Sequence, residues 1–387
     1  MKILKVIDNI DEETGGGATE RTRQLSIQFS RLGHEVKILT TAFNFSKEKK
    51  NELENEKLKI IALPILISRF YIPFPFLFRI RDLVREAEII HIVSHWSVIS
   101  LMTYFFIRLY KKKYSVSPLG ALTIFGRSRF LKRIYNIFIG RKIIQNASAC
   151  IVATLNETPE FKKLGIEESN LIHIPNGINQ EDYELKGDSE FRQRLGISDS
   201  SFILFIGRLN NIKGPDLLLE AFCQVKDRYS DLQLVYIGPD EGLISSLEKR
   251  AKDYNIENRV HFLGFVSRED KSRLINQCHF LTVPSRREAM SIVVLEAGIV
   301  GRPALITDQC GFQELEIAEG GLIVPASIEG IRNGIEGMMN MGEEINNLGL
   351  NLKELVSKNY LWSSTAKRSI SVFKALVDDE IIKQIKA

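Results

Sequence analysis

The sequence predicts an α/β protein built from two Rossmann-like, doubly wound domains that face each other across a cleft. Short apolar runs alternate with segments of helical periodicity along the whole chain, which is typical of parallel sheets flanked by helices. With 387 residues, the chain is too long for one ordinary hydrophobic core. A polar, charged stretch from 182 to 201 has no strand of its own. We therefore expect domains at 1–182 and 183–365, with a C-terminal helix at 366–387 that packs back on the first domain.

The first half opens with a strand, a helix and a second strand, as a doubly wound fold does. The helix carries apolar residues at Leu25, Phe29 and Leu32 and ends at Gly33. The stretch from 47 to 57 is highly charged, and we expect a solvated loop there. The predicted strands of this half are 3–7, 35–40, 58–63, 89–93, 114–117, 150–153 and 171–174.

The second half repeats the pattern of strands and helices after the polar stretch. Its apolar runs predict strands at 202–206, 232–237, 260–262, 280–283, 304–306 and 322–324. A helix is expected at 291–297, ending near Gly301. The chain therefore contains two Rossmann-like units rather than one.

Composition favours a soluble globular enzyme, with 44% hydrophobic and 26% charged residues. Residues 89–107 include no Asp, Glu, Lys or Arg and approach the length of a membrane-spanning helix. However, His and Ser residues cluster in the first two thirds of that stretch, which favours a strand, a polar turn and a buried helix. Four widely spaced cysteines predict reduced core residues in a cytoplasmic protein; they are Cys150, Cys223, Cys278 and Cys310.

Charge is distributed unevenly along the chain. The net charge is +4, but residues 69–142 contain 14 basic and 3 acidic residues, a balance of +11. Aromatic residues lie among these cations, which suits an anionic membrane surface and peripheral attachment. Ordinary helices that pack their aromatics into the core explain the pattern equally well. Nucleic acid is a poorer partner, because no known binding motif accompanies the charge.

Two cations follow the predicted strand at 202–206. Arg208 and Lys213 would stand together at the carboxyl end of that strand, where a fork-shaped cation and a point charge could grip a diphosphate. Two cations in a loop are more often simple surface residues. Their position at a strand end favours the functional interpretation.

Carboxylates follow the predicted strand at 280–283. Glu288 lies just before the expected helix, close to the backbone amides of Met290, Ser291 and Ile292 at its positive end, which suit a phosphate. Glu296 lies among apolar neighbours, where a carboxylate is costly unless a hydroxyl or a cation pairs with it. The structural alternative is a helix-capping Glu288 and an ion pair at Glu296.

Two weaker signals lie in the first half. Gly15, Gly16 and Gly17 fall between the first strand and the first helix, where glycines permit close approach to a ligand, although a merely flexible loop is about as plausible. His91 and His95 lie at the end of the predicted strand at 89–93 and could contact a sugar. Hydrogen-bonded core histidines are the somewhat better interpretation.

Together these residues resemble the retaining GT-B glycosyltransferases of family four, also called group one. The resemblance rests on Gly207-Arg208-Leu209 with Lys213-Gly214, on Gly238-Pro239, and on Glu288 followed after seven residues by Glu296-Ala297. Pro175-Asn176-Gly177 and Gly33-His34 are further, less specific marks. The match extends over nearly the whole chain.

The resemblance implies an N-terminal acceptor-binding domain and a C-terminal domain that binds a nucleotide sugar. It implies that Gly207, Arg208 and Lys213 hold the donor diphosphate and that Glu296 binds the ribose hydroxyls. Glu288 would contact the transferred sugar, with the amides at Met290, Ser291 and Ile292 on sugar or phosphate, and Gly16 would approach the phosphates from the facing domain. No metal or other cofactor is expected.

Two positions depart from the family pattern. Leu119 stands where the family often has a His that reaches the donor sugar, so that contact is missing. Ser291 stands where Gly is frequent and narrows the space beside the phosphates. The expected function is transfer of a hexose, with retention, to a saccharide or lipid-linked saccharide in cell-surface polysaccharide synthesis. The rivals are a GT-B epimerase or hydrolase of nucleotide sugars, and a non-catalytic membrane-associated subunit.

Overall fold

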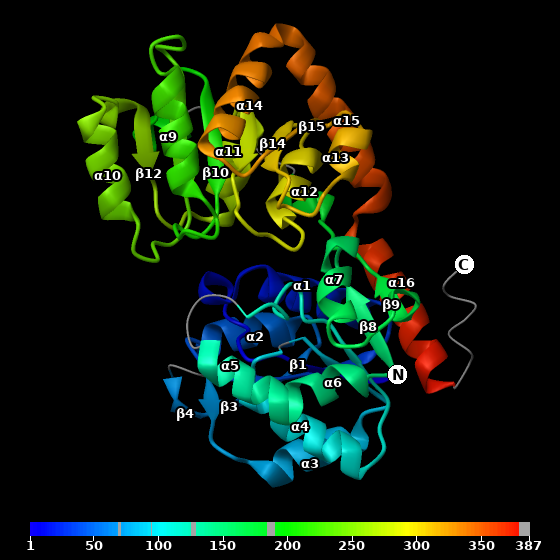
Figure 1. The fold of residues 1–387 in the computed structure, drawn as a ribbon. Coiled ribbons are helices and arrows are strands. Elements are labelled where there is room, and N and C mark those ends of the chain that lie inside the picture. The colour runs from blue at the N-terminus through cyan, green and yellow to red at the C-terminus, as the bar shows by residue number, and fades with distance from the viewer. Residues whose placement is uncertain (69–70, 94, 125–128, 184–189, 379–387) are drawn as a thin grey trace. The chain divides into compact units, whose positions relative to one another are not determined.

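The computed structural model describes residues 1–68, 71–93, 95–124, 129–183 and 190–378, and it contains two compact units (Figure 1). Unit 1 comprises 1–176 together with 362–387, and unit 2 comprises 177–361. The chain passes between the units six residues before the expected boundary at 182 and returns four residues before the one at 365. The reason lies in unit 2, where the amide of Ile178 donates to the carbonyl of Tyr360 at 2.8 Å, so the two crossings run side by side.

Unit 1 contains a parallel sheet with the strand order β3-β2-β1-β6-β7-β8-β9. All seven strands predicted for this half are present. Their bounds are β1 Lys2–Val6, β2 Glu35–Thr41, β3 Lys59–Leu63, β6 Ile89–Ile92, β7 Tyr114–Val116, β8 Ala149–Val152 and β9 Leu171–His173. An antiparallel hairpin of β4 Ile65–Ile67 and β5 Ile72–Pro73 was not predicted, because its strands are very short and have no apolar alternation.

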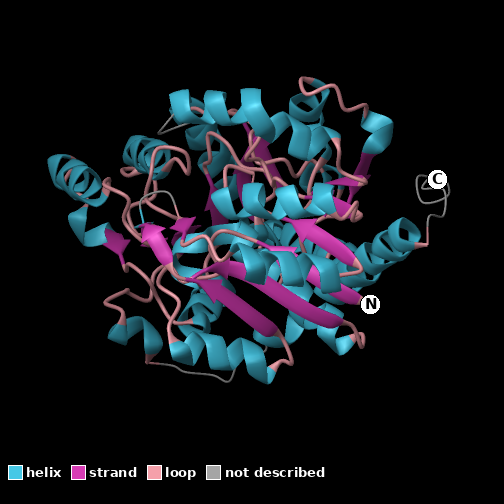
Figure 2. Ribbon diagram, turned by 90° about the horizontal axis from the view of Figure 1, so that it is seen from below, coloured by secondary structure: helices cyan, strands magenta, loops and turns pink. Residues whose placement is uncertain are grey.

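Helices flank this sheet, and most of them bury apolar residues in the core of unit 1. Figure 2 shows the strands side by side with helices around them. The helices are α1 Glu12–Arg31, α2 Lys47–Asn55, α3 Leu77–Glu86, α4 Val98–Leu109, α5 Arg129–Tyr135, the π-helix η2 Asn136–Gly140, α6 Arg141–Gln145, α7 Thr158–Lys162 and α16 Trp362–Val377. Residues 89–107 form β6, a turn and most of α4, as predicted. None of the described helices is both long enough and apolar enough to cross a membrane.

Two predictions for unit 1 were wrong. Residues 47–55 form helix α2, not a loop, because the Ser46 hydroxyl accepts from the amide of Lys49 at the N-terminus and Leu53 is buried. The three glycines lie inside the first turns of α1 rather than in a loop before it. The helix is interrupted at Gly16, which has φ 64° and ψ −155°.

The expected C-terminal helix is α16, which packs on α1 in unit 1. The ring of Phe373 lies 5.8 Å from that of Phe29 and 5.6 Å from that of His91. Residues 379–387 lie outside the described residues.

Unit 2 contains a second parallel sheet with the order β12-β11-β10-β13-β14-β15. The six predicted strands are all present, as β10 Phe202–Ile206, β11 Gln233–Ile237, β12 Val260–Phe262, β13 Phe280–Val283, β14 Ala304–Thr307 and β15 Gly321–Val324. The helices are α8 Phe191–Arg194, α9 Pro215–Val225, α10 Ile244–Asp253, α11 Arg268–Gln277, α12 Ile292–Ile299, α13 Glu314–Ile317, α14 Ile328–Asn340 and α15 Ile345–Asn359. The core of this unit is apolar.

The four cysteines of the chain, Cys150 in unit 1 and Cys223, Cys278 and Cys310 in unit 2, are buried free thiols. Their burial in the cores was predicted from the sequence.

Candidate functional site

The candidate site lies at the point in unit 2 where the strand order reverses. β10 is paired with β11 on one side and with β13 on the other, all in parallel. In open parallel sheets the loops after the strands diverge at such a point and leave a crevice at the carboxyl ends. The loops that follow β10 and β13 carry most of the predicted site residues.

The loop after β10 is held in shape by Asn210. Its side-chain oxygen accepts from the amides of Ile212 and Lys213, both at 3.0 Å. Gly214 then starts α9 with φ 70°, and Pro215 occupies the first helical turn. A Cβ at Gly214 would lie 2.1 Å from the carbonyl oxygen of Pro284, so the loops after β10 and β13 are in direct contact.

Arg286 joins the two loops, a role that our reading of the sequence missed. Its guanidinium donates to both carboxylate oxygens of Asp216, at 2.8 and 2.6 Å, and to the carbonyl of Asn211 at 2.7 Å. Its own amide donates to the carbonyl of Ile212 at 2.8 Å. A guanidinium that donates two hydrogen bonds to one carboxylate fixes the relative orientation of the two groups as well as their distance. The only sequence signal was its position immediately after a strand.

Lys213 and Glu288 meet across this junction. The ammonium of Lys213 forms an ion pair with a carboxylate oxygen of Glu288, and both side chains are partly buried. The amide of Glu288 donates to the carbonyl of Gln309 at 2.9 Å, which anchors the loop at its other side. The structure therefore brings together two predicted site residues that are 75 positions apart.

Arg208 lies in the same loop as Lys213 but pairs with a different carboxylate. Its guanidinium bonds Glu241 at 2.9 Å, and Asn210 donates to the other oxygen of Glu241 at 2.7 Å. The side chains of Arg208 and Glu241 are each 42% exposed, so water weakens the pair and an anionic ligand could replace the carboxylate. Gly207 lies under this pair, where a Cβ on Gly238 would come within 2.1 Å of its carbonyl oxygen.

Glu296 is a buried carboxylate on α12, and its two oxygens differ in their hydrogen bonding. One oxygen accepts from the ammonium of Lys271 on α11 at 2.8 Å. The other is buried and has no hydrogen-bond partner within the described part of the chain. A buried acceptor of this kind is costly unless a donor reaches it, and a ligand hydroxyl would satisfy it. Lys271 was not predicted, because nothing in its local sequence marks it.

The start of α12 completes this group. Met290 and Ser291 are buried, Ser291 precedes the first helical residue, and Ile292 begins the helix. The first amides of a helix have no intrahelical partner and carry its positive dipole end. Cys310 lies nearby, but burial, reinforced by the Glu288 charge, raises the pKa of its thiol to about 11. A thiol in that state is not a nucleophile at neutral pH.

The weaker candidates in unit 1 are explained by packing. His91 is buried and hydrogen-bonds the hydroxyl of Ser115 at 2.8 Å, and His95 is buried and bonds Asn136 at 3.0 Å. Burial lowers the pKa of His95 to about 4 and holds the pKa of His91 well below its usual value. Both residues therefore match the alternative of core histidines.

Leu119 is half-buried and has φ 51°, next to Gly120 with φ 77°. Gly120 donates its amide to the buried carboxylate of Glu157 at 2.7 Å, and Glu157 also accepts from the amide of Ala153 at 2.9 Å. Burial raises the pKa of Glu157. The turn at Leu119 is thus held by the carboxylate of Glu157, a residue that was not predicted from the sequence.

Family models cover both halves of the chain. Residues 15–182 match the model described as Glycosyltransferase Family 4, and residues 187–355 match the model described as Glycosyl transferases group 1. The chain belongs to the group 1 glycosyltransferases and has the GT-B fold.

Relatives and solved structures agree with this assignment. An uncharacterized glycosyltransferase of Methanocaldococcus jannaschii, MJ1607, is 24% identical over 98% of this chain and 99% of its own length. The alpha-D-kanosaminyltransferase of Streptomyces kanamyceticus is 28% identical over 48% of this chain and 49% of its own. The crystal structure of Anabaena Alr3699/HepE with UDP and glucose is similar with a TM-score of 0.79 at 18% identity, covering 97% of this chain and 100% of that one.

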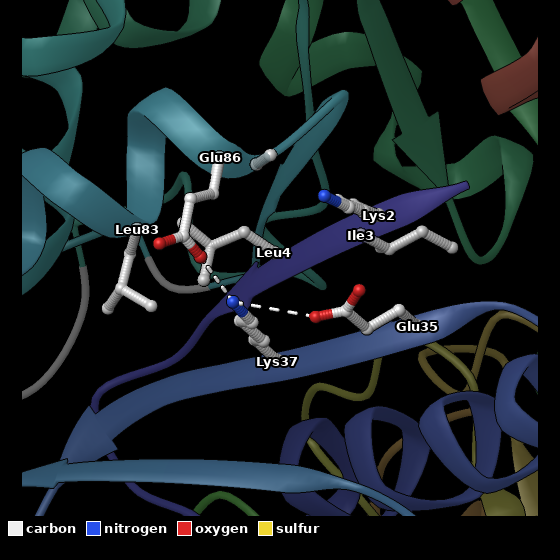
Figure 3. Close-up of a pocket in the computed structure, with 8 residues that line it drawn as sticks. Lys2, Ile3, Leu4, Glu35, Lys37, Leu83 and Glu86 are labelled. Carbon is white, nitrogen blue, oxygen red and sulfur yellow. Dashed lines mark hydrogen bonds and ion pairs between the residues drawn. The ribbon is translucent and has the colours of Figure 1, made fainter.

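This glycosyltransferase has a small pocket in unit 1 that contains none of the candidate site residues. It is lined by residues at the amino ends of β1 and β2 and by the end of α3, the edge of the sheet opposite to that which binds ligands in open α/β folds (Figure 3). Lys37 lies there between Glu35 and Glu86 and pairs with both. The hydrogen bond to Glu86 raises the pKa of Lys37 and lowers that of Glu86. These charges satisfy one another, and we assign the pocket no role.

Proposed function

We propose that this glycosyltransferase moves a hexose from a nucleoside-diphosphate sugar to a hydroxyl of a saccharide or lipid-linked saccharide, with retention at the anomeric carbon, in the synthesis of a cell-surface polysaccharide. The observation that supports this most is the contact between Lys213 and Glu288 where the strand order of unit 2 reverses. This contact brings together a cation and a carboxylate close to the start of α12. The phosphates of a nucleotide sugar could bind the cation and the helix amides, and the hydroxyls of its sugar could bind the carboxylate.

In the proposed reaction, the bond between the anomeric carbon and the diphosphate oxygen breaks. A bond to the acceptor oxygen forms on the same face of the sugar, and the acceptor proton passes to the departing diphosphate. Arg208, Lys213 and the amides at Met290, Ser291 and Ile292 would neutralise the charge that grows on the leaving group, in place of a metal ion. Arg208 and Lys213 would then exchange Glu241 and Glu288 for phosphate oxygens.

Two further residues would hold the donor. Glu296 would accept from a ribose hydroxyl through the oxygen that has no partner, while Lys271 keeps the other oxygen fixed. Glu288 would turn to the hydroxyls of the transferred sugar once Lys213 bonds phosphate. Gly16 at the kink of α1 is proposed to approach the phosphates with its backbone.

The reaction is tested first with a panel of nucleotide sugars. The true donor should raise the melting temperature, since a ligand that binds the folded state stabilises it. Incubation of that donor with candidate acceptors, followed by NMR of the product, then reports the anomeric configuration. An inverted product would contradict retention. Free sugar formed without an acceptor would show that the enzyme is a hydrolase, and an epimer formed without an acceptor would show that it is an epimerase. Turnover that is lost in EDTA and restored by a divalent ion would contradict the metal-free proposal.

Replacement of Lys213 tests the site itself. We expect Lys213→Ala to lower kcat by roughly 10²–10³-fold, the usual effect of removing one preorganised group that stabilises transition-state charge. The fold should survive, because the side chain is partly exposed and its neighbours are held by Asn210. Lys249→Ala, on the exposed face of α10, is the matched control and should leave kcat unchanged. Near-normal turnover by Lys213→Ala would overturn the site.

A further inference from the structure

We propose that the outward face of the helical segment 129–145 in unit 1 binds the surface of an anionic phospholipid bilayer. This segment, here called the basic helix, consists of α5, η2 and α6 in one continuous run (Figure 1). Its function as a docking surface does not depend on the identity of the donor or the sugar, so it can be tested without substrate.

The basic helix has apolar residues on the face that points away from the protein. Phe130 is 72% exposed, and Ile137 and Phe138 are each 70% exposed. Ile134 lies four residues after Phe130 and therefore on the same helical face, and Leu131 is also exposed. A helix that only covers a core is polar on its outer face, so a run of exposed aromatic and branched residues indicates a binding surface.

The inner face of the same helix packs against the core of unit 1. Tyr135 and Ile139 contact the core cluster, and Ile143 and Ile144 are fully buried. The outer residues are therefore presented by an anchored helix and not by a loose end. Packing uses one face, and the apolar residues of the other face are exposed.

The π-turn in the middle of the basic helix is built into this packing. A Cβ at Gly140 would lie 2.5 Å from the side-chain oxygen of Asn136 and 2.7 Å from the ring of Tyr135, so a larger residue would displace these side chains. Asn136 bonds the buried His95, and the hydroxyl of Tyr135 donates to the carbonyl of Ser97 at 3.3 Å. These contacts lock the turn that carries Ile137 and Phe138.

The charges of the basic helix select the partner. Its five charged residues are all cations, with no Asp or Glu between 129 and 145; they are Arg129, Lys132, Arg133, Arg141 and Lys142. A second copy of this chain on the same face would bring these cations against one another, which opposes a symmetric dimer. An anionic bilayer offers the opposite charge to the cations and an apolar interior to the aromatics.

Vesicle co-sedimentation of the full chain tests the proposal. Wild-type protein should bind vesicles with about 30 mol% phosphatidylglycerol more tightly than pure phosphatidylcholine vesicles, and raised salt should weaken the binding. Phe130→Ser with Phe138→Ser should lower the partition coefficient roughly tenfold or more, because two buried rings are lost from the interface. Replacement of Arg129, Arg133 and Arg141 by Gln should weaken binding to anionic vesicles by about fivefold per charge and leave the little binding to neutral ones unchanged.

A matched control separates this face from general surface hydrophobicity. Ile317→Ser with Leu350→Ser removes two exposed apolar side chains from unit 2 and should leave vesicle binding unchanged. Equal melting temperatures of all variants would show that the fold is intact. Wild-type protein that binds anionic and neutral vesicles alike, or a Phe130→Ser, Phe138→Ser variant that binds as wild type does, would overturn the proposal. Sedimentation equilibrium that shows a wild-type dimer, dissociated by the same variant, would assign the face to a second copy instead.

Discussion

At the scale of single residues, burial decides how the ionisable groups of this glycosyltransferase behave. Glu296 is buried with one oxygen on Lys271 and the other without a partner among the described residues, a state that a donor hydroxyl would relieve. His95 is buried with one ring nitrogen on Asn136, and its other nitrogen also has no partner in the described structure. Glu296 belongs to the candidate site in unit 2, whereas His95 is packed inside unit 1. Similar burial therefore indicates binding in one case and packing in the other.

The histidine predicts a dependence of stability on pH. Burial lowers the pKa of His95 to about 4 in the folded state, while the unfolded chain titrates near 6.5. Between these values the unfolded state binds more protons, so the stabilisation is complete above pH 6.5 and is lost as the pH falls toward 4. From pH 7 to pH 5, we expect His95 to account for a loss of about 2 kcal/mol in the free energy of unfolding.

Urea unfolding followed by tryptophan fluorescence measures this loss, because both tryptophans, Trp96 and Trp362, belong to unit 1. The variant His95→Gln keeps a donor toward Asn136 but does not titrate, so the difference between the two pH values should shrink by the same amount. An unchanged difference in His95→Gln would show that His95 is not the group that titrates.

At the scale of elements, the site depends on how closely the loops after β10 and β13 approach. Arg286 bonds Asp216 through both guanidinium arms, and Gly214 lets the backbone of Pro284 come near. These contacts set the distance between Lys213 and Glu288, which come from opposite sides of the strand reversal. Binding residues that are fixed in this way need little rearrangement when the ligand arrives.

The variant Gly214→Ala tests the approach of the two loops. The new Cβ would lie 2.1 Å from the Pro284 oxygen, and the backbone has φ 70°, so both a clash and a strained conformation result. We expect a loss of more than about 2 kcal/mol in the free energy of unfolding and a fall in kcat.

Gly196→Ala is the control for backbone strain alone. Gly196 has φ 69°, but nothing lies within 4 Å of its Cβ position, so the variant should lose only about 1 kcal/mol and keep its kcat. Equal effects of the two substitutions would show that the contact with Pro284 does not position the loops.

At the scale of the whole molecule, the two units differ in how the chain completes them. Unit 2 is one continuous stretch, 177–361, whereas unit 1 needs α16 from the far end of the chain. Phe373 of α16 lies against Phe29 on α1 and against His91 at the end of β6. The core of unit 1 is therefore closed by a helix that follows the whole of unit 2 in the sequence.

Removal of that contact should destabilise one unit selectively. We expect Phe373→Ala to lower the free energy of unfolding of unit 1 by about 3–5 kcal/mol, as the loss of a buried aromatic ring does. Hydrogen exchange should speed up in the sheet of unit 1 and stay unchanged in the sheet of unit 2. Leu350→Ala, at an exposed position on α15, should change neither. Equal acceleration in both sheets after Phe373→Ala would mean that the units do not unfold separately.

Local sequence patterns were sufficient to predict the parallel strands and the loops that follow them. Every one of the thirteen predicted strands is present, because a buried parallel strand is a short, continuous apolar run that can be recognised locally. The same logic located Lys213 and Glu288, since each follows such a run. Family models then confirmed the resemblance that these residues carried.

The tertiary structure alone decided which residues meet. Lys271 pairs with Glu296, and Arg286 with Asp216, over separations of 25 and 70 residues, and no local pattern records such partners. The helix at 47–55 was missed for a related reason: its charged sequence has a weak apolar stripe, and one cap and one buried leucine stabilise it. Hydrophobic periodicity is a property of neighbours in the sequence, whereas ion pairs, caps and close backbone approaches depend on the packing of distant segments.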